Sequence, residues 1–387
     1  MPGKENRSQT LLNEIAGGLG DVGVFVPLAL ALVIENGFDL QGIFLAAGLF
    51  YLLSGTWFGI PMPVQPLKAM AAIALASGLS QEVLHVAGIE FGAIMLLLLI
   101  PGAAGILQKL FPLPVIRGIQ LALGIILAKT GVSMALGSPP LAMLAAALFA
   151  ATLLFIRALP PILPVLAAGV IIAIVRGDPA SVAAAGPAAK TLSPVMSLDG
   201  LLFPLVALVI PQLGLTVGNS VMATIQTAKD LFRERSRRVT LRSLATSIGI
   251  GNVLSPLLGG IPMCHGSGGL TAHYRFGART GRATATVGAL FLLIALLPGR
   301  YSQHVLFGFP LPFLGVPLVI VGVFHALLAR KILVRGNHAA AAVVTALASV
   351  LTHNLTAGAA LGLVTFKIQE SLVYILAKRK ALREKYE

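Results

Sequence analysis

Two short polar breaks interrupt an otherwise apolar chain, and they hold most of the side chains that could bind an ion. The first break is GIPMPVQPLKAM at residues 59–70, with three prolines, one amide and one lysine. The second is GIPMCHGSGGL at residues 260–270, which repeats the opening Gly-Ile-Pro-Met and then becomes glycine-rich. Because proline removes a backbone donor and obstructs the preceding helical turn, a helix in the first break can begin only near Val64 or Pro66. We therefore expect a helix to start within each break.

The N-terminus of a helix that is shielded from water suits an anion. Its first N–H groups have no partner within the helix, and together they carry about half a positive charge. We expect backbone N–H groups at residues 65–67 and 266–269 to hold an oxyanion, with glycine allowing close approach. The alternative is that both breaks are kinks filled by neighbouring helices. The candidate substrate-binding residues in the breaks are Pro63, Val64, Gln65, Lys68, Cys264, His265, Gly266, Ser267, Gly268 and Gly269.

Three charged residues in apolar surroundings are candidates for further roles. An ammonium group within a membrane is costly unless it is paired or used, so Lys68 either attracts a dianion or pairs with Asp21. Asp21 lies in a glycine-rich run, and its counterpart in the second half of the chain is the neutral Asn219. This asymmetry predicts a proton-coupling role for Asp21, with a plain Lys68 salt bridge as the alternative. Glu90, a lone acid in an apolar segment, is the second proton-carrier candidate.

A polar stripe runs through residues 211–220, PQLGLTVGNS. We expect this stripe to lie beside the binding cavity, which makes Gln212, Asn219 and Ser220 further substrate-binding candidates. Hydrogen bonding between helices is the alternative role, because such side chains also hold membrane spans together.

The composition excludes most other classes of protein. The chain has 387 residues, of which 57% are hydrophobic and 11% charged, and its mean hydropathy is +0.91. These values predict a polytopic membrane protein. The net charge of +14 comes from short basic runs between apolar segments, so we do not expect nucleic-acid binding. The single cysteine, Cys264, excludes an internal disulfide framework and a metal site built from cysteines, and we expect no cofactor.

The chain divides into two halves of seven predicted spans each, for about 14 in total, if about 20 apolar residues make one span. Three anchors repeat in order: Gly20 with Gly218, Gly59 with Gly260, and Phe111 with Phe309, at offsets of 198, 201 and 198 residues. An odd number of spans places the second repeat in the opposite orientation. The predicted spans are 14–34, 39–57, 64–79, 83–109, 113–131, 139–157 and 160–176, then 200–227, 239–258, 265–277, 283–298, 305–329, 338–352 and 355–377.

Loop charges predict the orientation in the membrane. With the N-terminus inside, the inner loops are rich in Lys and Arg and the outer loops carry few, as the positive-inside rule requires. We therefore expect a multi-pass protein of the cytoplasmic (inner) membrane with both termini cytoplasmic. Its predicted parts are a cytoplasmic tail at 1–13, the first repeat at 14–176, an external connector at 177–199, the second repeat at 200–377 and a cytoplasmic tail at 378–387.

The longest motifs resemble a known family. The runs GDVGVFVPLALAL at 20–32, GIPMPVQPLKAMAAIA at 59–74, PQLGLTVGNSV at 211–221 and PMCHGSGGLTAHYRFGARTG at 262–281 resemble the molybdate transporter family related to sulfate permeases. The resemblance implies an all-α fold of two inverted seven-helix repeats, similar to that of uracil permease, in which a core domain moves against a gate domain. It implies molybdate as first substrate and sulfate as second, and it leaves room for a homodimer in the lipid bilayer.

These observations predict a secondary transporter of an inorganic oxyanion that works by alternating access. An anion channel of the same architecture is the first rival. A nucleobase carrier is a weaker one, because the two breaks lack paired carboxylates that could read a base edge.

Overall fold

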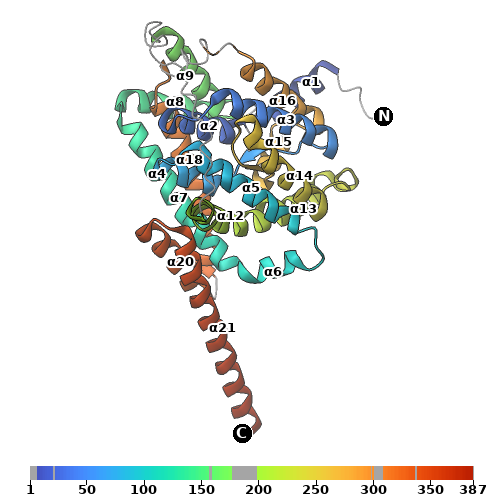
Figure 1. Cartoon of the computed structure of the whole chain (residues 1–387), viewed down its shortest axis with the longest axis vertical. Helices are drawn as coiled ribbons and strands as arrows, with labels where there is room; N and C mark the ends of the chain where they lie inside the picture. Colours follow the sequence, from blue (N-terminus) through green and yellow to red (C-terminus); the bar gives the residue numbers. More distant parts are fainter. Residues whose placement is uncertain are drawn as a thin grey trace.

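The computed structural model describes residues 7–20, 22–156, 159–176, 198–297, 299, 308–335 and 338–386, and Asp21 lies outside them. Helices from both halves of the chain are intermixed in one body, from which the last helix extends (Figure 1). The first half contains α1 (Arg7–Gly18), α2 (Val22–Asn36), α3 (Leu40–Phe58), β1 (Gln65–Pro66), α4 (Lys68–Ser77), α5 (Gln81–Leu97), α6 (Ala103–Leu110), α7 (Leu113–Leu136), α8 (Pro139–Phe155) and α9 (Ile162–Arg176).

The second half begins with one long helical stretch that alternates between α and π geometry. Its segments are α11 (Leu198–Pro204), η1 (Leu205–Val209), α12 (Ile210–Leu215), η2 (Thr216–Met222) and α13 (Ala223–Phe232), where η1 and η2 are π-helical. After it come η3 (Arg233–Ser236), α14 (Leu241–Leu254), η4 (Ser255–Leu258), β2 (Met263–Cys264), α15 (Ser267–Arg275), α16 (Gly281–Ala295), α18 (Pro312–Leu327), α19 (Arg330–Arg335), α20 (Ala339–Thr352) and α21 (Leu355–Tyr386).

The helix pairs that pack most extensively reflect the inverted repeat. Helices α3 and α14 each precede a break, and α5 and α16 each follow one, so the contact of α3 with α16 recurs as that of α14 with α5. Helix α7 packs against its own counterpart, α18. Glycines permit these close approaches, as in the contact of Gly92 with the backbone of Gly249. The elements around the breaks, α2–α5 and α11–α16, form the core, and α7–α9, α18, α20 and α21 form the gate.

The described chain has four helical stretches that are long and apolar enough to cross a membrane by length and composition alone. They are Leu40–Phe58, Leu113–Leu136, Leu198–Ser236 and Leu355–Arg379, and seven shorter apolar helices accompany them. The short ones include α4, whose ten residues span only about 15 Å. The architecture is thus the predicted polytopic helical bundle with short third helices in both halves.

Several predicted boundaries are wrong. Residues 83–109 form two helices, because Pro101 and Gly102 interrupt the apolar run and Gly102 has a left-handed φ of 88°. The helix after the first break begins at Lys68 instead of Val64 or Pro66, since Gln65 and Pro66 are extended and form β1. Residues 14–34 are divided between α1 and α2, and α21 continues beyond residue 377. The fold is also not purely helical, because β1 pairs with β2.

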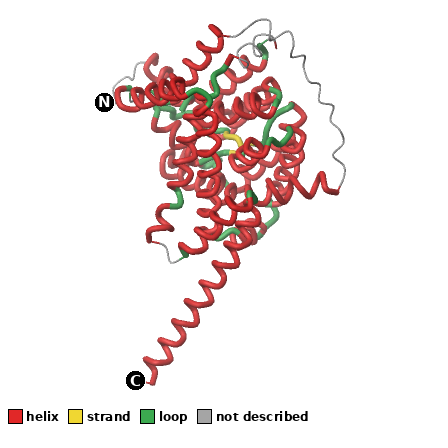
Figure 2. Tube along the Cα trace, turned by 90° about the vertical axis from the view of Figure 1, so that its left-hand side faces the viewer, coloured by secondary structure: helices red, strands yellow, loops and turns green. Residues whose placement is uncertain are grey.

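The two breaks come together at the short sheet. Glycines end the helical segments before them: Gly59 after α3 and Gly259 after η4 have left-handed φ angles of 67° and 73°. In Figure 2 the strand pair lies inside the helical body and is surrounded by helices. The sheet is antiparallel, with Gln65 opposite Cys264 and Pro66 opposite Met263. Segments about 200 residues apart in the sequence therefore share one buried junction.

Candidate binding site at the paired helix breaks

Two half-helices start from this shared junction. Helix α4 begins at Lys68, two residues after Pro66 of β1, and α15 begins at Ser267, three residues after Cys264 of β2. The residues before them, Leu67 and Gly266, are extended and make no side-chain cap. The first turns of both helices thus present N–H groups beside the buried strand pair, with Lys68 partly buried and Gly268 exposed, and the partial charges of the two helix N-termini add there. This arrangement can hold an anion.

Some of the backbone donors expected to bind the anion are used by the protein. The Leu67 N–H donates to the Pro262 carbonyl (2.8 Å), which extends the pairing of the strands. The Ala69 N–H donates to Oε1 of Gln212 (2.9 Å). Of the backbone donors expected at 65–67, Leu67 is thus occupied and Pro66 has no N–H. The first turn of α4 is partly capped from another helix.

Gly268 has open space beside it. A Cβ atom built on Gly268 would have no heavy atom within 4 Å. A Cβ on the neighbouring Gly266 would instead lie 2.7 Å from Oε1 of Gln65. The side chain of Gln65 therefore lies against the start of α15, and the unfilled space adjoins the next turn at Gly268.

Lys68 lies at the first residue of α4 and contributes the full positive charge of the junction. Its Nζ donates to Oε1 of Gln65 at 2.6 Å. Lys68 is partly buried, and no carboxylate among the described residues forms an ion pair with it. It also lies close enough to His325 of α18, in the gate, for the two side chains to interact electrostatically. Lys68 therefore joins the junction to the boundary between core and gate.

His265 lies in the second break, but both of its ring nitrogens have protein partners. Nδ1 is 2.8 Å from the Pro63 carbonyl and Nε2 is 2.9 Å from Oγ of Ser247. The ring is fully buried and packs against Phe50 and Phe58, with centroids 5.2 and 5.3 Å away. The sequence predicts that His265 binds the substrate, but its contacts with two protein groups favour a structural role. His265 ties one break to the other.

The helix before each break supplies a polar side chain that holds it. Tyr51 of α3 donates to the Val64 carbonyl (2.5 Å). Asn252 of α14 makes two bonds to Met263, accepting from its N–H (2.8 Å) and donating to its carbonyl (2.6 Å). Neither Tyr51 nor Asn252 was predicted from the sequence. They lie 201 residues apart, the same offset that separates Gly59 from Gly260, so aligning the two repeats would have found them.

The polar stripe in the second half docks against both breaks. Gln212 of α12 is 3% exposed; besides capping Ala69, it donates through Nε2 to Oγ1 of Thr216 (3.0 Å). Ser220 of η2 donates to Sγ of Cys264 (3.3 Å). The π geometry of η2, which is common at functional sites, shifts the register of this stripe against the junction. The stripe lies where it was expected, but the contacts of Gln212 and Ser220 are with protein groups. Asn219 belongs to η2, and its side chain lies outside the description.

Of the two proton-carrier candidates, only Glu90 is among the described residues, and it lies away from the site. Asp21 lies outside the described residues. Glu90 lies on α5, where Gly88 faces Pro262 of the second break. Two residues along a helix correspond to a rotation of about 200°, so Glu90 points away from that break. Its Oε2 atom is nevertheless buried and makes no hydrogen bond within the described chain.

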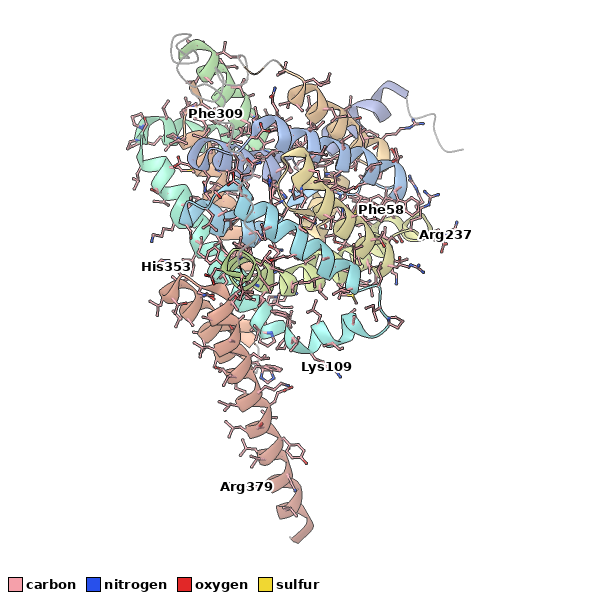
Figure 3. All side chains as sticks on the ribbon, viewed as in Figure 1. Phe58, Lys109, Arg237, Phe309, His353 and Arg379 are labelled. Carbon is pink, nitrogen blue, oxygen red and sulfur yellow. The ribbon has the colours of Figure 1, made fainter. Side chains whose placement is uncertain are left out.

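A cavity of about 740 Å³ lies between core and gate beyond the junction. It is lined by the C-terminal half of α4 (Ile73, Leu75, Ala76 and Ser77), by residues of α2 and α7, and by Leu311 before α18 and Val350 and His353 at the end of α20. Its polar lining includes Glu35, Lys129 and His353, the last of which is labelled in Figure 3. From Lys68 to Ile73 is less than one and a half turns of α4, so the cavity begins close to the site.

Comparison with known proteins agrees with this architecture. A family model described as "Molybdate transporter of MFS superfamily" matches residues 13–127 and 204–324, more than half of the chain. The chain belongs to the molybdate transporter family. Molybdate transporter 2 of Arabidopsis thaliana is 30% identical over 372 residues, which cover 83% of this chain and 79% of that protein. Molybdate transporter 1 of Chlamydomonas reinhardtii is 30% identical over 444 residues, which cover 84% of this chain and 85% of that protein.

Solved structures of two other transporters have a fold similar to that of this chain. The transmembrane domain of a cyanobacterial bicarbonate transporter, BicA, matches with a TM-score of 0.64 at 19% identity, covering 92% of this chain and 97% of that one. The murine anion transporter Slc26a9, in its inward-facing state, matches with a TM-score of 0.63 at 16% identity, covering 97% and 70%. The fold is therefore that of the sulfate-permease-like transporters, with two inverted repeats and paired discontinuous helices. Family and fold together support anion transport.

Proposed function

We propose that this chain is a secondary active transporter that takes up molybdate by alternating access. The observation that carries the proposal is the pair of half-helices, α4 and α15, whose N-termini share one buried junction with Lys68 and the open space beside Gly268. A tetrahedral dianion matches both features, because helix N-termini and one ammonium group supply positive potential and several donors. The molybdate transporters that this chain resembles support molybdate as first choice.

In this proposal the residues of the site have two kinds of role. Lys68, the backbone at Gly268 and Gly269 and the amide of Gln65 contact the anion. His265, Gln212, Ser220 and Cys264 position the two breaks, as their protein contacts indicate. Since these positioning bonds all lie in the core, the site moves as one unit when the core moves against the gate.

The cavity between core and gate is the proposed access route from the outer side. Helix α4 leads from the site to Ser77 in the cavity lining, and the connection from α4 to α5, between the predicted spans 64–79 and 83–109, lies on the outer side if the N-terminus is inside. Closing this cavity by movement of α4 against α7 would isolate the anion from that side. We further propose that both termini are cytoplasmic, because this orientation places the loops rich in Lys and Arg on the cytoplasmic side, as the positive-inside rule requires.

Proton coupling is a second part of the proposal and rests on Asp21. Its repeat counterpart is the neutral Asn219, so only one of the two equivalent positions can titrate. An acid that binds a proton on one side and releases it on the other would drive accumulation of an anion.

Uptake into liposomes tests the proposed function. Purified protein should accumulate radioactive molybdate against its gradient when the lumen is alkaline, and an uncoupler should abolish the accumulation. Voltage-driven currents at channel rates, without accumulation, would favour an anion channel. If unlabelled sulfate competes more strongly than unlabelled molybdate, the chain is a sulfate transporter of the same fold.

A further inference from the structure

A second hollow lies on the outside of the core, away from the binding junction. It is a groove of about 720 Å³ between α3 and the stretch formed by α14 and η4. Most of its wall is apolar, and several lining side chains are exposed at the surface of the protein. They include Leu49, Leu53, Ile250 and Leu254. In a bilayer, such a surface is in contact with acyl chains.

One end of the groove is basic and rich in hydroxyl groups. Arg238, Thr240, Arg242 and Ser243 line it together with Trp57. Arg238 donates to the Trp57 carbonyl (2.7 Å), and its guanidinium lies 5.7 Å from the centre of the Trp57 ring. Figure 3 shows the neighbouring residues Arg237 and Phe58 at the same end of the body. Neither Arg238 nor Arg242 forms an ion pair with a carboxylate in the described part of the chain.

The charge and shape of this groove select one kind of occupant. Tryptophan is typical of the membrane interface, so the basic end lies at the depth of lipid headgroups. Two guanidinium groups with nearby hydroxyls suit a phosphate, which they can bind by charge-assisted hydrogen bonds. The apolar length of the groove suits an acyl chain. We propose that the groove binds an anionic phospholipid, with its phosphate at Arg238 and Arg242 and one acyl chain along α3 and α14.

The wall of this groove separates it from the binding junction, and two wall residues contact the breaks. Ser247 lines the groove and bonds Nε2 of His265, whose Nδ1 holds the Pro63 carbonyl. Ser255 also lines the groove and donates to the Ile261 carbonyl (2.9 Å). A lipid in the groove therefore packs on groups that fix both breaks. We infer that the bound lipid strengthens molybdate binding, a second step that rests on the proposed function.

Lipid binding is tested first, without any substrate. Native mass spectrometry should show dioleoyl phosphatidylglycerol bound to the purified protein in preference to dioleoyl phosphatidylcholine. The Arg238→Gln/Arg242→Gln variant should bind phosphatidylglycerol about tenfold or more weakly, since each basic residue near a membrane surface contributes about a fivefold gain. Arg242→Gln alone guards against misfolding, because no hydrogen bond of its side chain is lost, and it should show part of the effect.

The matched control removes two positive charges from the same basic run, residues 229–242, at positions outside the groove. Lys229→Gln/Arg235→Gln should bind phosphatidylglycerol as the wild type does, because both residues are exposed and neither lines the groove. Equal losses in the two double variants would overturn the proposal in favour of unspecific attraction by the loop. An absence of preference for phosphatidylglycerol in the wild type would overturn it as well.

The coupling is tested by molybdate affinity in vesicles of the two compositions. Phosphatidylglycerol should tighten molybdate binding in the wild type and not in Arg238→Gln/Arg242→Gln, whereas Ser247→Ala should bind the lipid and lose the tightening. Unchanged affinity despite normal lipid binding would refute the coupling. If molybdate fails to bind in either vesicle, the proposed function fails, while the lipid measurement still decides the lipid site.

Discussion

Replacing Asn252 by leucine tests how the second break is held. Asn252 is fully buried, and its amide satisfies both the N–H and the carbonyl of Met263. Leucine has nearly the same shape but leaves two buried backbone groups without partners, at about 1–3 kcal/mol each. We expect a loss of about 2–6 kcal/mol in the free energy of unfolding. Tyr51→Phe leaves the Val64 carbonyl without the Tyr51 hydroxyl, so the loss expected from this one bond is about 1–3 kcal/mol.

The ratio of the two losses in free energy of unfolding tests the reasoning more strictly than either loss alone. Both free energies are measured by reversible unfolding of the purified protein in sodium dodecyl sulfate, so both refer to the same unfolded state. Asn252→Leu should be about twice as destabilising as Tyr51→Phe, and both should weaken molybdate binding in detergent, although neither residue is proposed to touch the anion. Equal stability of Asn252→Leu and the wild type would refute the view that side chains of α14 hold the break.

The other predictions concern single groups of the site. Lys68→Met should weaken binding of a dianion far more than of a monoanion, measured by calorimetric titration; equal losses would indicate a structural role. Asp21→Asn should bind and exchange molybdate but lose accumulation driven by a pH gradient in liposomes, whereas intact accumulation would transfer the coupling role to Glu90. Gln212→Leu should lower both the melting temperature and molybdate affinity because Ala69 loses its acceptor, and Thr216→Val, which leaves that bond in place, should have the smaller effect.

Local sequence patterns predicted where the breaks lie, because they depend on residue types. Proline at 61, 63 and 66 in the first break and at 262 in the second is incompatible with a continuous helix, and this holds without knowledge of the fold. The repeat of Gly-Ile-Pro-Met at an offset of 201 residues then predicted that the breaks are equivalent. The structure confirms the inverted-repeat fold that followed from these patterns.

The pairing of the breaks could not be predicted in the same way. Gln65 lies opposite Cys264 through backbone hydrogen bonds between segments about 200 residues apart, and no local pattern encodes that partner. For this reason the helix start predicted from the sequence, Val64 or Pro66, lies before the observed start of α4 at Lys68. The same limit applies to His265, whose contacts with Ser247 and Pro63 depend on how three separate segments pack.

The central claim is that helix N-termini at the junction hold the anion, and Gly268 tests it most directly. Gly268→Val places its Cβ atom in the open space beside α15, more than 4 Å from other protein groups, so the melting temperature should stay at the wild-type value. Gly105→Val on α6, where a Cβ also meets no atom within 4 Å, is the matched control and should bind molybdate normally. Calorimetric titration should show that Gly268→Val has lost molybdate binding; wild-type affinity in this folded variant would contradict the account.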